Sequence, residues 1–574
     1  MIDFLISKNN QAFTDKNWIK TKLLDNVFLF SGKIDLLRKT QTYKLIIIGD
    51  CINIEQIDSS QIQIDYIIHM LKGNFYAFLV QNNKLYITSS AFGLLPVYFI
   101  QGFSLISSSV SLIKENTSSS LSENKKWLVN QYLFNFQFGT DTFYEEINLF
   151  PCMSYLILDG TSKTFNKYFS IEDAFEEKPV PWRVSMNSLS DLFIKNTKLY
   201  IPDSGSVISF TGGFDGRTLV SVATKYNKQF ETFSYGKKEN DDVFIPQKNA
   251  RKLGISYSWL DLSKEYSGNE YYGSALNYIY STNGSNGFLY AHVDYSARKI
   301  KQKSDILISG VCGSELFRAV HATGAITSKA IIELFKQDDF KFFKKLVLES
   351  YVFKFVDIAD YKSSIEEVIN EAWRYKNNLN NRLDKNQKLY VFLYEEIFRK
   401  FFGAWVKAQM KYINVRTPYI DFDFFKEVIK TELSGAYSDF LTGNPIKRFK
   451  GQLLYAEIIR KTNKKLYALK TGKGYAPYIV RVSVLRPFLL IPFLLKRIRR
   501  NVITTNLDNL GIISGIKNTV YSKTTRTNFE SLNSHDLDRL YKQSEKLDDF
   551  SKESMRDTIL MAWSNLHYIK SLKD

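Results

Sequence analysis

The chain has 574 residues, which is too long for one ordinary core and predicts roughly two to four folded units. Hydrophobic residues at 44% and charged residues at 24% are the proportions of a water-soluble globular protein. The 77 basic and 59 acidic residues give a net charge of +18, which either favours anionic partners or reflects a lysine-rich composition alone. Three cysteines and five scattered histidines show no pairing or ligand spacing. They argue against a disulfide framework and a histidine metal site and favour a reducing, cytoplasmic compartment.

The first third of the chain is typical of β-structure. Its short apolar runs are β-branched or aromatic and end at Gly, Asn or Pro, as strands do. Together they predict an antiparallel, layered N-terminal domain that ends near residue 185. The expected strands are 43–50, 73–81, 84–90, 96–100 and 153–160.

From about residue 205 the pattern changes to strands that alternate with helical stretches. Strands are expected at 207–210, 230–236, 255–262 and 305–310, and a helix at 243–254. This alternation predicts a parallel sheet wrapped by helices. Beyond residue 327 the chain is expected to be mostly helical.

The apolar stretch 485–500 is the one membrane-like segment in the sequence. Pro487 and Pro492 interrupt it, and it falls short of the roughly 20 residues that span a bilayer. It is expected to be buried against the preceding domain, the alternative being contact of its basic flank with a bilayer or a partner. The N-terminus lacks the pattern of a signal peptide.

Residues 207–223, VISFTGGFDGRTLVSVA, pass from an apolar strand through two glycines into a helical pattern. Glycines at such a turn let an anion approach backbone N–H groups at a helix N-terminus. The turn therefore predicts a phosphate cradle, although a Gly-Gly turn of this kind is also ordinary turn chemistry.

Five segments in one order resemble the asparagine synthetase family. They are 211–217 (TGGFDGR), 232–236 (TFSYG), 308–317 (ISGVCGSELF), 414–425 (NVRTPYIDFDFF) and 473–477 (KGYAP). Segments 71–80, 89–99 and 147–156 are similar to the glutamine amidotransferase half of the same family. The resemblance covers about residues 40 to 480.

The resemblance implies an α/β fold with a particular division of the chain. Residues 1–185 are expected to form an Ntn-hydrolase-like αββα amidotransferase domain. Residues 186–480 are expected to form an adenine-nucleotide α-hydrolase (PP-loop) synthetase domain, and residues 481–574 a mostly helical extension. In the family, a cysteine directly after the initiator methionine attacks glutamine. Ile2 stands here and cannot form a thioester, so the N-terminal domain is expected to be a scaffold without glutaminase activity.

The resemblance also implies an ATP and Mg²⁺ site. Asp215 is the expected metal ligand. The family's second aspartate is replaced by Ser314, so that either Glu315 substitutes for it or Asp215 holds the ion with water and phosphate. Arg217 replaces a serine and either contacts the phosphates or is a solvated helix residue. The implied nucleotide-binding residues are Ser209, Thr211, Gly212, Gly213, Asp215, Gly216, Arg217, Ser234, Tyr235, Gly236, Gly310 and Gly313.

For catalysis, the family's spacing points to Lys473, with Lys470 as the alternative. A fixed ammonium would stabilise charge on the α-phosphate and on the tetrahedral centre. The candidates for general base are Tyr394, Glu395 and Glu396 in a helical segment. Asp421 either orients the site or stabilises its own turn.

Three functions follow as alternatives. The first is an ATP-dependent ligase, like lasso-peptide cyclases and β-lactam synthetases. It adenylates a carboxylate and joins it to an amine of a small molecule or precursor peptide, with a protease or leader-binding protein as a possible partner. The second is an ammonia-dependent enzyme like asparagine synthetase. The third is a non-catalytic binding protein, which the replacement at Ser314 motivates. No nucleic-acid partner and no transmembrane segment are expected.

Overall fold

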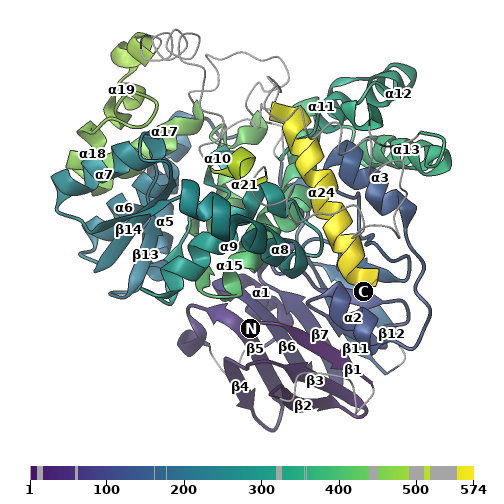
Figure 1. The fold of residues 1–574 in the computed structure, drawn as a ribbon. Helices are drawn as coiled ribbons and strands as arrows, with labels where there is room; N and C mark the ends of the chain where they lie inside the picture. Colours follow the sequence, from purple (N-terminus) through teal and green to yellow (C-terminus); the bar gives the residue numbers. More distant parts are fainter. Residues whose placement is uncertain are drawn as a thin grey trace.

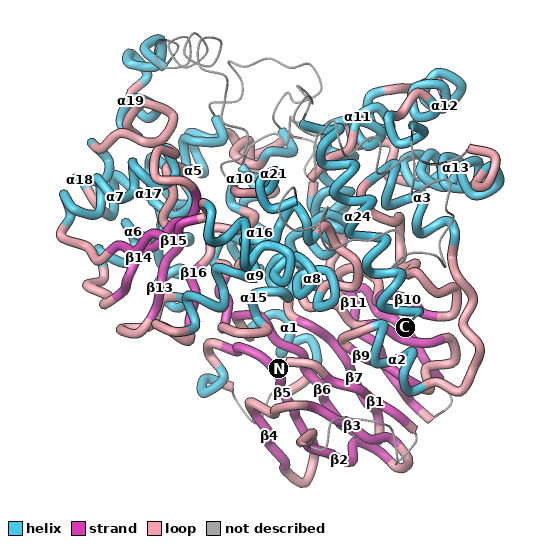
Figure 2. The backbone as a smooth tube through the Cα atoms, viewed as in Figure 1, coloured by secondary structure: helices cyan, strands magenta, loops and turns pink. Residues whose placement is uncertain are grey.

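The fold is taken from a computed structural model, shown in Figure 1. The described residues are 2–8, 17–57, 62–160, 162–175, 178–317, 326–354, 356, 358–437, 450–489, 491, 510–516 and 553–573. The protein is of the α/β class, with two antiparallel sheets in its N-terminal part and a five-stranded parallel sheet with helices after them. Figure 2 shows the strands of the parallel sheet apart from those of the antiparallel sheets.

The N-terminal part contains two six-stranded antiparallel sheets. The first has the order β10-β8-β9-β1-β3-β2 and the second β12-β11-β7-β6-β5-β4. The strands are β1 (Phe4–Ser7), β2 (Ile19–Leu24), β3 (Val27–Ser31), β4 (Leu36–Lys39), β5 (Tyr43–Cys51), β6 (Gly73–Gln81), β7 (Lys84–Ser89), β8 (Tyr98–Ile100), β9 (Leu105–Ser107), β10 (Ile147–Leu149), β11 (Ser154–Asp159) and β12 (Ser162–Lys167).

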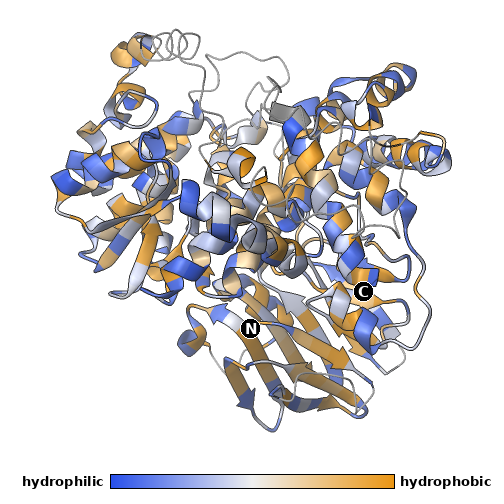
Figure 3. Cartoon of the chain, in the orientation of Figure 1, coloured by the Kyte–Doolittle hydropathy of each residue, from blue (hydrophilic) through white to orange (hydrophobic). Residues whose placement is uncertain are grey.

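Alternation along β6 explains why this part forms layers. Tyr76 and Phe78 are fully buried in the large core that also contains the first sheet. Their neighbours Ala77 and Leu79 are buried in a second cluster, with Ile67 of helix α1 (Ile64–Met70). Successive side chains of a strand point to opposite faces, so one apolar strand fills two cores. Figure 3 shows the resulting hydrophobic strands in orange.

The parallel sheet has the order β15-β14-β13-β16-β17, and all its neighbouring pairs are parallel. Its strands are β13 (Ser206–Ser209), β14 (Phe230–Gly236), β15 (Tyr257–Asp261), β16 (Ile306–Ile308) and β17 (Asn414–Arg416). The first strand, β13, lies in the middle, and the chain moves outward from it in both directions. Such a reversal of strand order leaves a crevice at the carboxyl ends of the strands, where α/β proteins bind ligands.

Helices make up most of the rest of the described chain. Helix α24 runs back across the molecule and packs on α3, α8 and α9. The remaining α-helices are α2 (Val110–Asn116), α3 (Lys125–Phe134), α4 (Ile171–Ala174), α5 (Trp182–Tyr200), α6 (Asp215–Lys225), α7 (Asp241–Leu253), α8 (Tyr271–Ser281), α9 (Gly287–Lys301), α10 (Gly313–Phe317), α11 (Lys329–Lys336), α12 (Phe340–Leu348), α13 (Lys362–Asn378), α14 (Lys385–Phe392), α15 (Gly403–Met410), α16 (Phe422–Val428), α17 (Lys450–Thr462), α18 (Lys464–Ala468), α19 (Pro477–Arg481), α21 (Ile512–Gly515) and α24 (Glu553–Lys573), and η5 (Leu393–Phe402) is π-helical.

Buried polar contacts join the antiparallel sheets to the parallel sheet. Arg416, at the end of β17, donates to both carboxylate oxygens of Asp50, at 2.6 and 3.0 Å. Asn74 of β6 donates to the carbonyl of Val415 at 2.8 Å. The bidentate arginine and the amide fix the distance and the orientation between β17 and the strands β5 and β6.

The expectation that the stretch 485–500 is buried is wrong for its described part. Phe488 is 54% exposed and Ile491 is 52% exposed. Residues 490 and 492–500 of the stretch lie outside the described residues. None of the helices within the described ranges is long and apolar enough to cross a membrane.

Candidate nucleotide site at the switch point of the parallel sheet

In the glycine turn between β13 and α6, the backbone lies very close to other backbone segments. A Cβ at Gly216 would lie 2.1 Å from the carbonyl oxygen of Ser209, and one at Gly212 would lie 2.9 Å from that of Asp241 and 3.2 Å from Cα of Gly472. No side chain fits at these distances, so glycine is required for packing. The glycine loop, residues 211–213, therefore lies at the carboxyl end of the central strand, where a switch-point ligand binds.

The amides of the glycine loop already have acceptors in this structure. The N–H of Gly212 donates to Oδ1 of Asp242 at 3.0 Å, and the N–H of Gly213 donates to Oγ1 of Thr211 at 3.3 Å. A phosphate that used these donors would have to displace a carboxylate and a hydroxyl. The loop thus has the shape of an anion cradle, with the side chains of Thr211 and of Asp242 on α7 in the anion's position.

Asp215 is the centre of a hydroxyl network. Its Oδ2 accepts from Ser314 at 3.0 Å, and its Oδ1 accepts from Tyr455 of α17. The hydroxyl of Tyr419 donates to the carbonyl of Asp215 at 2.8 Å. The network brings together segments that follow β13, β16 and β17, as the switch point predicts.

Two further glycines make room for this carboxylate. A Cβ at Gly310 would lie 2.9 Å from Cβ of Asp215, and one at Gly313 would lie 2.8 Å from its Oδ1. Ser314 and Glu315 follow Gly313 on the short helix α10. The serine that replaces the expected second aspartate is therefore in place as a hydrogen-bond donor to the first.

Lys473 lies in a tight turn that packs on the glycine loop. Thr471 donates from its N–H to the carbonyl of Tyr475 at 2.9 Å, and Gly474 has a φ of +91°. The N–H of Gly472 donates to the carbonyl of Gly212 at 2.7 Å. The residue before Lys473 is thus bonded to the predicted phosphate loop. The side chain of the alternative, Lys470, is exposed.

Arg217 is fully buried, and its guanidinium holds the segment that leads to this turn. Nη1 donates to the carbonyls of Leu466 at 3.3 Å and Leu469 at 3.2 Å, and Nη2 donates to that of Lys470 at 2.9 Å. Burial lowers the pKa of Arg217 to about 10. A solvated position for this residue is wrong, and the described bonds go to carbonyls rather than to a phosphate position. Arg217 positions the Lys473 turn instead.

No family model and no curated protein matches this chain. The assignment of the site therefore rests on the geometry of the switch point. Within the ranges that the structure describes, no three His, Cys, Asp or Glu residues gather as a ready metal site. A magnesium ion bound at Asp215 would be held by one carboxylate together with phosphate and water, which is a common arrangement for this ion.

Three of the predicted nucleotide-binding residues, Ser234, Tyr235 and Gly236, lie at the end of β14. Ser234 is fully buried, and its hydroxyl lies 2.6 Å from that of Tyr257, which donates to the carbonyl of Val243 at 3.1 Å. The ring of Tyr235 lies 4.9 Å from that of His292, and the carbonyl of Gly236 accepts from Trp259 at 2.8 Å. The side chain of Ser234 therefore stabilises the sheet edge.

The three candidate bases lie on η5 and have partners elsewhere. Tyr394 is fully buried with its hydroxyl 3.3 Å from that of Ser434, and burial raises its pKa. Glu395 accepts from Lys167 at 2.8 Å, and burial raises its pKa. Glu396 is paired with Arg399 at 2.8 Å and with Lys400. None of these described bonds reaches the glycine loop, so a role as general base stays a prediction.

Asp421 has a structural set of partners. It is 1% exposed and accepts from Asn196 at 2.7 Å and from Tyr200 at 3.0 Å. Its Oδ1 caps α16 through the N–H of Phe424 at 3.1 Å, and Lys72 of the N-terminal part lies 3.0 Å from Oδ2. Of the two roles open from the sequence, the structure supports the stabilisation of its own turn.

Several residues of the site had no signal of function in the sequence. Asp242 was not among the predicted site residues, and its carboxylate accepts from the N–H of Gly212. Tyr455 and Tyr419 are aromatic residues in apolar segments, which are ordinarily core residues. Only the fold shows that their hydroxyls meet at Asp215.

Proposed function

We propose that the protein is an ATP-dependent ligase that adenylates a carboxylate and forms an amide with an amine. The observation that carries the proposal is the convergence at the switch point. The glycine loop with Asp215, the Ser314 segment and the Lys473 turn come from distant parts of the chain and meet at the carboxyl edge of β13. The order of their segments, and their resemblance to the asparagine synthetase family, support ATP as the ligand.

The proposed chemistry has two balanced steps. A substrate carboxylate oxygen attacks the α-phosphorus of ATP, and the bond to the β-phosphate breaks to release pyrophosphate. An amine nitrogen then attacks the acyl carbon of the adenylate and loses a proton, and AMP leaves. Lys473 would stabilise the negative charge of both transition states, and Asp215 would hold Mg²⁺ at the phosphates.

In this proposal the two antiparallel sheets correspond to an Ntn-hydrolase-like amidotransferase domain, and the parallel sheet to a PP-loop synthetase domain. The same proposal includes the partners of a cyclase-type enzyme, namely a precursor peptide and a protease or leader-binding protein. A second candidate, a non-catalytic binding protein, is favoured by one observation: Asp242 and Thr211 occupy the acceptor positions at the cradle amides.

ATP–pyrophosphate exchange tests the proposal. With a suitable carboxylate or peptide, wild-type protein should exchange labelled pyrophosphate into ATP in the presence of Mg²⁺. Asp215→Ala should lower this exchange by at least about tenfold, because it removes the carboxylate that this proposal assigns to the ion. Asp203→Ala is the matched control, since that carboxylate is exposed and pairs with Lys228. Equal exchange by the wild type and Asp215→Ala would remove Asp215 from the site.

Ile2 leads to a separate prediction. Its side chain is 3% exposed and packs in the N-terminal core. Because an alkyl group cannot attack an amide, purified protein should release no glutamate from glutamine above the uncatalysed rate. Glutamate release that disappears when Cys51 or Cys152 is replaced would contradict this prediction. Neither thiol is expected to act as a nucleophile, because burial raises the pKa of both to about 12.

A further inference from the structure

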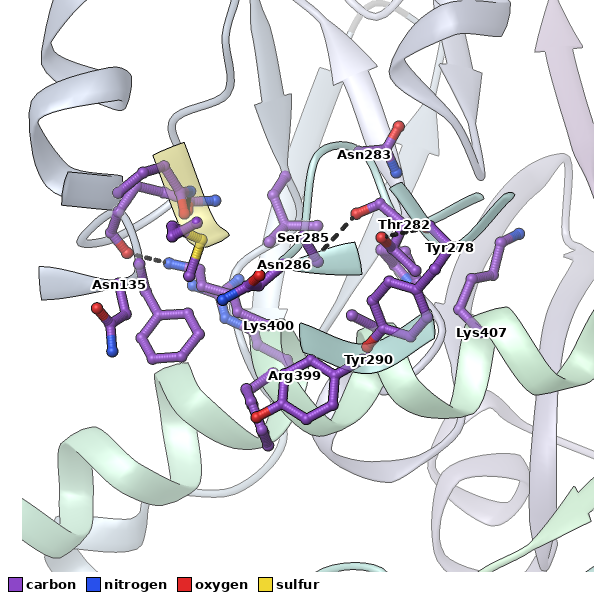
Figure 4. A pocket seen from close by; sticks show the side chains of 18 of the residues that line it. Asn135, Tyr278, Thr282, Asn283, Ser285, Asn286, Tyr290, Arg399, Lys400 and Lys407 are labelled. Atoms are coloured by element: carbon purple, nitrogen blue, oxygen red, sulfur yellow. Dashed lines mark hydrogen bonds between the residues drawn. The ribbon is translucent and has the colours of Figure 1, made fainter. Parts of the chain in front are cut away.

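A cavity of about 70 Å³ lies between the N-terminal sheets and the helices around α8, away from the glycine loop. Its walls come from four parts of the chain: the segment around Tyr98, helix α3, the segment from α8 to α9, and η5 with α15. Met561 of α24 completes the lining. Figure 4 shows the polar side chains of this cavity. The space is large enough for several waters or for one small ligand.

Three buried cations line the cavity. They are Arg399 and Lys407, each 5% exposed, and Lys400, whose side chain is 6% exposed. Glu396 pairs with Arg399 and Lys400, and Asp3 pairs with Lys407. Each cation therefore has a carboxylate partner, but two carboxylates face three cations, so these five side chains carry a net charge of +1 when all are ionised. A buried charge of this kind is costly unless an anion balances it.

The pKa of Lys400 reflects its burial. Desolvation is the largest cause of a shift of this pKa down to about 8, while the charge of Glu396 opposes that shift and the charge of Arg399 adds to it. Lys400 is bonded to carbonyls of the loop before β10, at Gln137 and Gly139. A fixed, desolvated ammonium is therefore part of the cavity wall.

Two buried donors of the lining have no hydrogen-bond acceptor among the residues that the structure describes. They are Nε of Arg399 and Nδ2 of Asn286. Both residues are otherwise well anchored. Arg399 donates to the carbonyls of Phe150 at 2.6 Å and Gly139 at 2.8 Å, and Asn286 caps α9 by accepting from Leu289 at 3.3 Å. Buried donors left unsatisfied cost free energy, and they indicate an acceptor that the protein itself does not supply.

We propose that this cavity binds a small oxyanion, either inorganic phosphate or a small carboxylate, between the N-terminal sheets and the helices of η5 and α15. The oxyanion accepts from Arg399 and Asn286 and balances the excess positive charge. This site is separate from the glycine loop and does not depend on the proposed ligase function. Because its walls come from several parts of the chain, the ligand also stabilises their association.

Calorimetric titration and thermal unfolding test the proposal, with sodium phosphate and sodium malonate as probes and sodium chloride at equal ionic strength as reference. Wild-type protein should bind at least one probe and unfold at a higher temperature with it than with chloride. Phosphate alone would identify an inorganic ligand, and malonate alone would identify a carboxylate; either result supports the site. Binding of neither would overturn it and leave a cavity filled with water.

Asn286→Asp locates the binding. An aspartate keeps the oxygen that caps α9 but replaces the free donor with a negative charge, so affinity should fall at least tenfold. Lys407→Gln, which removes one cation and keeps a donor toward Asp3, is the second variant and should weaken binding in the same direction. Asn463→Asp is the control, because it adds the same charge at the helix cap of α18, outside the cavity. Binding that is unchanged in both cavity variants belongs to another place, such as the glycine loop, and overturns the proposal.

Discussion

Replacement of Lys473 by alanine is expected to abolish most of the ATP–pyrophosphate exchange and leave the fold and most of the ATP affinity intact. Lys473 lies in the turn whose Gly472 is bonded to Gly212, so its ammonium would act at the phosphates. A preorganised group of this kind, which acts mainly on transition-state charge, typically contributes on the order of 10²–10³ in rate, or about 3–4 kcal/mol. Exchange rates at saturating ATP, and ATP affinity measured by calorimetry, separate the two effects.

Two variants sharpen this experiment. Lys473→Arg should not restore full activity, because a planar guanidinium cannot take the place of an ammonium without a shift of its hydrogen bonds. Lys470→Ala should be nearly neutral, since that side chain is exposed and only its backbone carbonyl is used. An inactive Lys470→Ala beside an active Lys473→Ala would show that the assignment is wrong by three residues. If both variants turn over normally, neither lysine takes part.

Arg217→Met is expected to lower the exchange rate by on the order of 10²-fold, since misplacement of a catalytic group by about 1 Å has effects of this size. Methionine fills much of the same volume but leaves the carbonyls of Leu466, Leu469 and Lys470 without their donor. Hydrogen exchange at the amide of Gly472 should become faster, because the turn is no longer fixed. If Arg217 only stabilised the fold, the variant would have a lower melting temperature without faster exchange at Gly472.

Comparison variants separate position from charge. Arg217→Lys keeps a cation but reaches fewer carbonyls, so partial activity is expected. Arg460→Met on α17 is the matched control, because Arg460 is exposed and pairs with Glu457 at 2.7 Å. If Arg217→Met exchanges pyrophosphate at the wild-type rate, the guanidinium does not position the Lys473 turn.

Local patterns in the sequence predicted the framework of the site. The strands at 207–210 and 230–236 were expected from short apolar runs, and β13 and β14 lie there. The expected helix at 243–254 corresponds to α7, which begins at Asp241 after its Asn240 cap and ends at a left-handed Gly254. These features depend on neighbouring residues, and so periodicity and caps are enough to find them.

Partners far apart in the sequence could not be predicted in this way. Arg217 in a helix pattern is ordinarily solvated, and only the fold places three carbonyls from another segment around it. Glu396, Arg399 and Lys400 have the spacing of a surface ion-pair cluster on a helix. They are buried because the loop before β10 covers them. Phe488 is exposed although its apolar stretch was expected to be buried, and this too could not be predicted from composition.

The bond between Gly472 and Gly212 also bears on how the protein is made. The glycine loop leaves the ribosome long before the turn that closes it, since all of β14 to α18 lies between them. At roughly 5–20 residues per second, translation needs on the order of ten seconds or more to supply the missing piece. During that interval the nascent chain has the cradle without its lysine. A truncated or stalled product can therefore fold its sheets and still have no complete site.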